Sequence, residues 1–124
     1  MAPDDETLEL PAAPRAAGLA RDFTRRCLAD ASADTLEGVT LCVSEMVTNA
    51  LDHARPPYAL RIAQDRTRLR VEVVDSSEAQ PEVRPISPHS ARGRGMFIVA
   101  RLATSWGVER HDRGKTVWAE FLIA

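Results

Sequence analysis

The sequence predicts a mixed α/β (α+β) fold in a single domain. Apolar residues recur at helical spacing through much of residues 14–54, whereas they alternate with polar residues in residues 58–74 and again near the end of the chain. The 124 residues, of which 44% are hydrophobic, are enough for one hydrophobic core. We therefore expect one domain over residues 1–124.

The first half of the chain predicts one short strand and two helices. Residues 7–10 alternate as a strand does, and apolar residues at helical spacing predict a first helix of about residues 14–30. Asp34 and Glu37 are spaced as a capping box and indicate the start of a second helix. That helix should end at about Ala54, because two consecutive prolines follow shortly after it.

The second half predicts strands, a long loop and a third helix. In order, these are strands over residues 58–64 and 69–74, a loop over 76–92, a helix that begins near residue 93, and a hairpin of strands over 106–111 and 115–123. The loop has several prolines and no periodic pattern, and its length of about 17 residues is unusual for a passive connector. Such loops are usually lids or binding segments.

Composition narrows the classes of function. The two cysteines lie in predicted helices without metal-like spacing, which argues against a disulfide framework and fits a cytoplasmic protein. The sequence has neither a charged-then-apolar leader nor an apolar run of membrane-spanning length, so we expect no export and no membrane insertion. The net charge of −2 disfavours a direct nucleic-acid partner. Residues 84–115, with seven Lys and Arg against two Asp and Glu, instead suit a polyphosphate ligand.

A polar stripe on the second predicted helix is the first candidate site. Glu45, Asn49 and Asp52 share one helix face, with His53 at its edge and an apolar stripe opposite. The polar stripe has no Lys or Arg, although solvated helix faces usually mix both signs. Its side chains are the donors that a hard cation and an attacking hydroxyl require. The alternatives are an ordinary solvated face and, for His53, a structural histidine at a helix end.

Asp75 and a glycine motif are the other two candidates. Asp75 ends an apolar strand on its inward face, where a carboxylate needs a hydrogen-bond partner such as a ligand amino group. A turn-forming aspartate is the alternative. Gly93-Arg94-Gly95 opens the third helix, and its glycines and free N–H groups suit a bound anion. Taken alone, a Gly-x-Gly before a helix is common, and Arg94 has the alternative of a solvated loop arginine.

Together and in this order, the motifs resemble those of the histidine-kinase-like ATPase superfamily, which includes DNA gyrase. Residues 44–54, Ser-Glu-Met-Val-Thr-Asn-Ala-Leu-Asp-His-Ala, are similar to a motif of its small bacterial branch, the anti-sigma-factor serine/threonine kinases. Residues 93–99 and 114–120 look like later motifs of that branch. The resemblance covers about residues 7–122. It implies a single histidine-kinase-like ATPase domain with a Bergerat-type ATP-binding fold, a two-layer sandwich with helices on one face of a mostly antiparallel sheet.

The resemblance also implies roles for individual residues. Glu45 would orient or deprotonate the attacking hydroxyl, and Asn49 would hold Mg²⁺. Asp75 would accept a hydrogen bond from the adenine amino group, with Thr116 assisting through a water. The residues implied to contact ATP or its Mg²⁺ are Asn49, His53, Asp75, Gly93, Arg94, Gly95, Met96 and Thr116.

The function implied is that of an ATP-dependent protein serine/threonine kinase that regulates transcription. Such a protein sequesters a sigma factor and phosphorylates a serine of an anti-anti-sigma antagonist, and the resemblance leaves a homodimer open.

Two departures from the family pattern keep an alternative open, a non-catalytic nucleotide-binding or purely protein-binding module with a degenerate ATP site. Residues 75–79 read Asp-Ser-Ser-Glu-Ala where the family has Asp-x-Gly-x-Gly. Strict alternation also places Thr116 with Trp118 and Glu120, and the sequence does not decide which face of that strand is inward. A third reading is a detached ATPase domain of another regulatory system.

Overall fold

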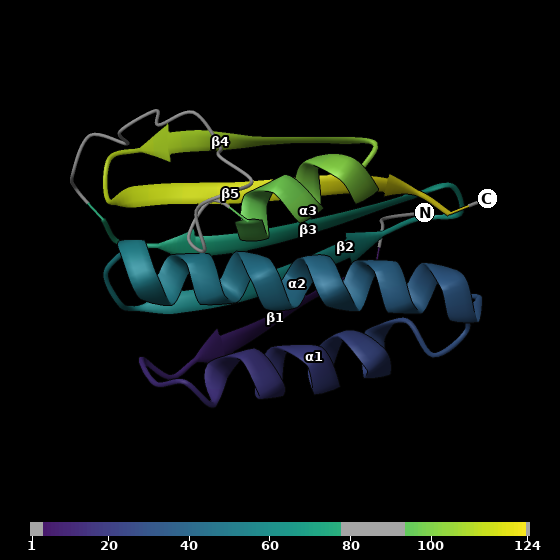
Figure 1. Cartoon of the computed structure of the whole chain (residues 1–124), viewed down its shortest axis with the longest axis horizontal. Coiled ribbons are helices and arrows are strands. Elements are labelled where there is room, and N and C mark those ends of the chain that lie inside the picture. Colours follow the sequence, from purple (N-terminus) through teal and green to yellow (C-terminus); the bar gives the residue numbers. More distant parts are fainter. Residues whose placement is uncertain (1–3, 78–93, 124) are drawn as a thin grey trace.

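The chain forms a five-stranded sheet with helices on one side, seen in a computed structural model that describes residues 4–77 and 94–123 (Figure 1). The strands are β1 (Asp4–Leu10), β2 (Tyr58–Gln64), β3 (Arg68–Asp75), β4 (Ser105–His111) and β5 (Gly114–Leu122). Their order in the sheet is β1-β2-β3-β5-β4, and every neighbouring pair is antiparallel.

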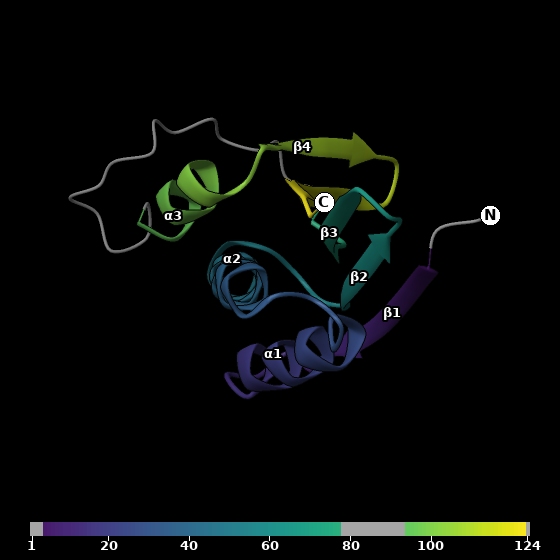
Figure 2. The same cartoon turned by 90° about the vertical axis from the view of Figure 1, so that its right-hand side faces the viewer.

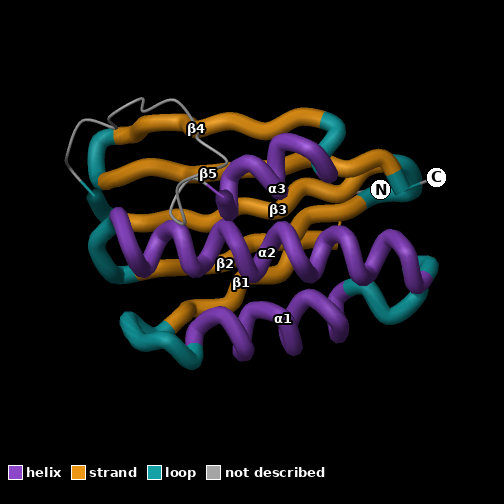
Figure 3. The backbone as a smooth tube through the Cα atoms, in the orientation of Figure 1, coloured by secondary structure: helices purple, strands orange, loops and turns teal. Residues whose placement is uncertain are grey.

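The helices are α1 (Ala16–Cys27), α2 (Ala33–His53) and α3 (Arg94–Leu102). All of them lie on the same face of the sheet, with α1 beside β1 and α3 on the side of β4 and β5 (Figure 2). α2 runs between α1 and α3 and packs against both (Figure 3). The predicted two-layer arrangement of helices on one face of an antiparallel sheet is therefore confirmed.

The largest differences from the predicted element boundaries are at three places. β1 begins at Asp4 rather than residue 7, because its first residues pair with the end of β2. α1 is shorter than residues 14–30 and ends in a turn after Cys27. The cap of α2 is Ser32 instead of Asp34, since the Ser32 hydroxyl accepts a hydrogen bond from the Thr35 N–H at 3.2 Å. Most of the predicted loop over residues 76–92 lies outside the described residues.

The core lies between α2 and the inward face of the sheet. The predicted apolar stripe of α2 is buried from Val39 through Val43 to Val47. It packs in one cluster with inward residues of β2 and β3, among them Leu60 and Val71, both 0% exposed. Burial of this face fixes α2 relative to the sheet and turns the opposite face of the helix, which bears Glu45 and Asn49, away from the core.

The outward face of the sheet is covered by ion pairs. Glu72 lies between Arg61 and Arg70, with nitrogen–oxygen distances of 2.8 Å to each. Burial of Glu72 opposes its ionisation, but the hydrogen bonds from Arg70 and Arg61 outweigh burial and lower the pKa of this carboxyl. The Arg70 guanidinium also stacks over the Trp118 ring, 4.4 Å from its centroid. These contacts help to hold β2, β3 and β5 side by side.

The two cysteines are free thiols, as the sequence predicts. Burial and the negative charge of Glu45 raise the pKa of Cys42 to about 11. Burial and a hydrogen bond from the Cys27 thiol to Glu6, 2.8 Å long, raise the pKa of Cys27 to about 12. Both thiols are therefore protonated and unreactive near neutral pH. In the part of the chain that the structure describes, no helix is long and apolar enough to span a membrane.

Candidate functional site

Two candidate residues, His53 and Asp75, end α2 and β3 close to the start of β5, at the end of the sheet drawn on the left in Figure 1. Ser76, just after β3, donates its backbone N–H to the carbonyl of Arg55 at 3.1 Å, which ties this strand end to the segment after α2. The Tyr58 hydroxyl donates to the Ala54 carbonyl at 3.0 Å and holds the start of β2 against the end of the helix. Burial, and then the charge of Asp75, raise the pKa of Tyr58.

Asp75 is buried on the inward face of β3, as the sequence predicts, and is only 3% exposed. Its Oδ1 accepts a hydrogen bond from the Ser77 backbone N–H at 2.8 Å. Its Oδ2 is buried and has no hydrogen-bond partner among the described residues. The Lys115 ammonium lies 2.9 Å from this oxygen as an ion-pair contact, without the alignment of a hydrogen bond. A buried carboxylate oxygen in this state favours a further donor, such as an N–H of a ligand.

Gly114 lets β5 start directly against the end of β3. Its φ of 155° is one that L side chains rarely adopt. A Cβ at this position would lie 2.0 Å from the Asp75 carbonyl oxygen, a distance that no real contact permits. Glycine is therefore required here, and it brings the next residue, Lys115, into register with Asp75.

Thr116 does not lie beside the Asp75 carboxylate, which corrects the role implied for it. Asp75 pairs with Lys115, so the next residue of β5 points to the outward face. The Thr116 hydroxyl lies there, 3.1 Å from Nε2 of His111. Alternation groups Lys115 with Val117 and Ala119, but only the structure shows that this group faces inward and that Lys115 is the residue beside Asp75.

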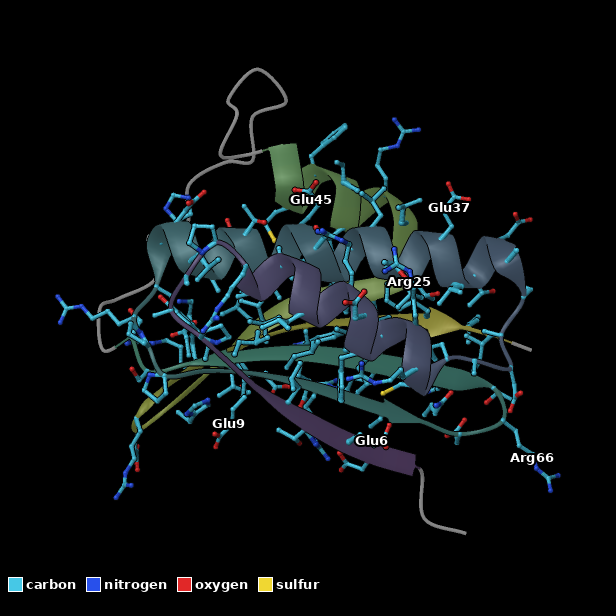
Figure 4. All side chains as sticks on the ribbon, turned by 90° about the horizontal axis from the view of Figure 1, so that it is seen from below. Glu6, Glu9, Arg25, Glu37, Glu45 and Arg66 are labelled. Carbon is cyan, nitrogen blue, oxygen red and sulfur yellow. The ribbon has the colours of Figure 1, made fainter. Side chains whose placement is uncertain are left out.

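Glu45 and Asn49 lie one turn apart on α2, and both are partly exposed. No hydrogen bond or ion pair joins either side chain to another described residue. Gly95, in the first turn of α3, packs against Glu45, since a Cβ on Gly95 would lie 2.8 Å from Glu45 Oε2. Figure 4 shows Glu45 on the side of α2 that faces α3. The structure thus brings Glu45 together with the start of α3, where the sequence motif predicts bound phosphates.

The remaining predicted site residues are His53, Met96, Gly93 and Arg94. His53 is the last residue of α2 and is exposed. Met96 is 8% exposed and belongs to the hydrophobic core. Gly93 and the side chain of Arg94 lie outside the described residues. Among the described residues, no three His, Cys, Asp or Glu side chains are placed to hold a metal ion. An Mg²⁺ ion would therefore need phosphate oxygens and waters beside Asn49, the usual coordination of nucleotide-bound Mg²⁺.

The close contact between Gly95 and Glu45 predicts that a substitution at Gly95 affects activity and leaves the fold intact. We expect Gly95→Ala to slow the phosphate transfer that the sequence motifs imply by about 10- to 100-fold, because the added methyl group displaces the Glu45 carboxylate from its position. The fold should tolerate the change, since the contacted atom ends a flexible side chain and alanine favours a helix. A phosphotransfer assay beside a melting curve checks both statements. Gly38→Ala is the matched control, because its Cβ would meet nothing within 4 Å. Equal rates for the two variants would contradict the prediction.

Comparison with known proteins identifies the family of this chain. A family model described as a histidine kinase-like ATPase domain matches residues 10–121. The chain therefore belongs to the histidine kinase-like ATPase domain family. Its fold is similar to that of the histidine kinase domain from the Erythrobacter litoralis EL346 blue-light activated histidine kinase, with a TM-score of 0.58 and 23% sequence identity. That match covers 91% of this chain but only 61% of the other. A comparison with curated proteins found no match.

Proposed function

We propose that this protein binds Mg-ATP and acts as a regulatory protein serine/threonine kinase. The observation that carries ATP binding is the buried Oδ2 of Asp75, which has no hydrogen-bond partner among the described residues. An adenine amino group is a neutral donor of the kind that this oxygen requires. A hydrogen bond to a charged acceptor contributes about 1.5–3 kcal/mol, enough to orient the base.

The phosphate end of ATP would lie between α2 and α3. The first turn of α3 offers free backbone N–H groups and the positive end of the helix dipole. Asn49 is one turn from Glu45 and offers a neutral oxygen to Mg²⁺, which neutralises phosphate charge when bound. Glu45 has no partner among the described residues that would occupy its carboxylate, so it remains free to accept a proton from an incoming hydroxyl.

We further propose that the substrate hydroxyl is a serine of an anti-anti-sigma protein and that the chain also sequesters a sigma factor. The support is the similarity of residues 44–54 and 93–99 to motifs of the anti-sigma-factor kinases. The test is co-purification of the chain with a sigma factor of the same cell, followed by addition of an antagonist and Mg-ATP. Release of the sigma factor with phosphorylated antagonist supports the proposal. Transfer to another protein, without affinity for any sigma factor, would favour an ATPase domain of another regulatory system.

Mg-ATP binding is tested directly by thermal unfolding. At about 100 times Kd, ATP should stabilise the native state by about 2.7 kcal/mol, which raises Tm by several degrees. Mg-ADP should also stabilise the fold, because the contacts at Asp75 involve the base alone. Absence of any shift at millimolar nucleotide, with folded protein confirmed by circular dichroism, would argue against the ATP site.

A second candidate function is a protein-binding module with a degenerate nucleotide site. Two observations favour it. Lys115 already neutralises Asp75 at 2.9 Å, and residues 77 and 79 are Ser and Ala where the family motif has glycines. This candidate predicts sigma-factor binding without phosphate transfer, with or without a weak thermal shift. The co-purification and transfer assays together separate the two candidates.

A further inference from the structure

Lys115 is the residue of the candidate site that the proposed function does not use. It is the only lysine of the sequence. Its Cα pairs with that of Asp75 across β3 and β5, and both side chains lie on the inward face. The Asp75 side chain is 1% exposed and that of Lys115 is 16% exposed, so the carboxylate is buried and the lysine side chain is partly accessible.

The contact between the two groups leaves donors free. A lysine ammonium has three N–H donors, and Asp75 Oδ2 can accept from one of them at most without crowding. The four-carbon stem lets the ammonium move while it stays near the carboxylate. Burying both charges is costly unless their remaining hydrogen-bonding capacity is satisfied. The pair therefore presents an acceptor and a donor side by side to a ligand at the end of β3.

We propose that Lys115 is the second base-reading residue of the nucleotide site. It donates a hydrogen bond to the ring nitrogen of adenine next to the amino group, while the amino group donates to Asp75 Oδ2. The adenine amino group is a donor and lies between two acceptors, N1 and N7. The amino group can therefore donate to Asp75 while one of these ring nitrogens accepts from Lys115. The inference rests on the proposed ATP binding and adds a specificity residue to it. Before ATP binds, the same lysine neutralises Asp75.

The test is a double-mutant cycle in which one change is a substitution in the protein and the other replaces one atom of the ligand. The ligands are ATP, 1-deaza-ATP and 7-deaza-ATP, in which a carbon replaces one of the two ring nitrogens. The proteins are the parent and Lys115→Met, which keeps most of the side-chain volume and removes the ammonium. Dissociation constants are measured by titration calorimetry, and folding of each variant is checked by circular dichroism.

We expect one of the two deaza analogues to bind the parent roughly 10- to 100-fold more weakly than ATP. Lys115→Met should bind ATP more weakly by a similar factor. The decisive result is that Lys115→Met binds ATP and that analogue equally, because the two changes remove the same hydrogen bond and are not additive. This comparison holds even where the substitution itself perturbs Asp75, since the perturbation affects both ligands.

A matched control tests the alternative of a general charge effect. Arg113→Met removes one positive charge two residues away, on an exposed position of the hairpin turn. It should leave the ratio between ATP and the deaza analogues unchanged. A second measurement uses protein labelled with ¹⁵N-lysine, which gives a single side-chain Nζ signal. ATP should shift this signal, and the analogue that lacks the contacted nitrogen should shift it less.

The outcomes separate this inference from the proposed function. Binding of ATP by the parent, with both deaza analogues within about twofold of ATP, overturns the role of Lys115 and leaves ATP binding intact. Tighter ATP binding by Lys115→Met also overturns it, because Lys115 would then compete with adenine for Asp75. No binding of ATP to the folded parent overturns the proposed function, and this inference falls with it.

Discussion

Replacing Glu45 with Gln is expected to lower the rate of phosphate transfer by about 10²- to 10⁴-fold, the range for loss of a general base. The change keeps the size of the side chain and removes its proton acceptor. Mg-ATP affinity should stay near that of the parent, because the role proposed for Glu45 concerns the incoming serine hydroxyl and not the nucleotide. The measurement is a phosphotransfer assay beside a nucleotide titration on both proteins.

Asn49→Ala provides the contrast one helical turn away. It removes the neutral oxygen offered to Mg²⁺, so Mg-ATP binding itself should weaken. The sigma-factor binding proposed above, through another surface, should survive Glu45→Gln. Phosphate transfer at the parental rate by Glu45→Gln would show that Glu45 is not the base and that the mechanism is wrong.

Asp75→Asn is expected to reduce ATP affinity by about 10- to 100-fold, since it removes one charge-assisted hydrogen bond. The amide also presents donors where the adenine amino group needs an acceptor. Any residual binding of GTP should suffer less, because guanine does not offer that amino group. Titration of parent and variant with both nucleotides measures the effect.

A melting curve separates recognition from stability in this variant. Asp75→Asn leaves Lys115 without its ion-pair partner. A lowered Tm with unchanged ATP affinity would mean that Asp75 serves the fold alone. Equal binding of ATP by variant and parent would show that Asp75 does not read the base.

Sequence periodicity predicted the elements that carry the core. The strand over residues 58–64 was predicted with the bounds that the structure has, because alternation and flanking turn residues agree there. The inward position of Asp75 followed from continuing the alternation of Leu69, Val71 and Val73. The cap of α2 was misplaced because Asp34 and Ser32 both suit a helix start, and only the backbone geometry around Thr35 distinguishes them.

The inward face of β5 could not be predicted for a physical reason. Alternation separated Thr116 and Trp118 from Val117 and Ala119, and an aromatic residue usually favours the buried side. Here Trp118 lies outward, covered by the Arg70 guanidinium and packed against Gly107, where an added Cβ would lie 2.9 Å from its ring. The contact with Arg70 joins segments far apart in the sequence, so no local pattern reveals it.

The contact between Glu45 and Gly95 is hidden from the sequence in the same way. The two residues lie on different helices, separated by β2, β3 and the connecting segments. The motifs identify each residue, whereas their mutual placement comes from the packing of α3 on α2. Similarly, the sequence identifies Gly114 as part of a hairpin turn, but only the structure shows that its missing side chain is what admits the Asp75 backbone.

The ion pair of Asp75 and Lys115, at the end of β3, favours ligand recognition but lowers thermal stability. The inward residues Leu69, Val71 and Val73 are at most 1% exposed, and Asp75 continues their row into the same apolar layer. Apolar replacement of a buried ion pair is often neutral or stabilising by about 1–4 kcal/mol. Variants selected only for a higher melting temperature would therefore tend to lose Asp75 and Lys115 together. Engineering of a robust form of this protein should hold these two positions fixed and seek its gains elsewhere.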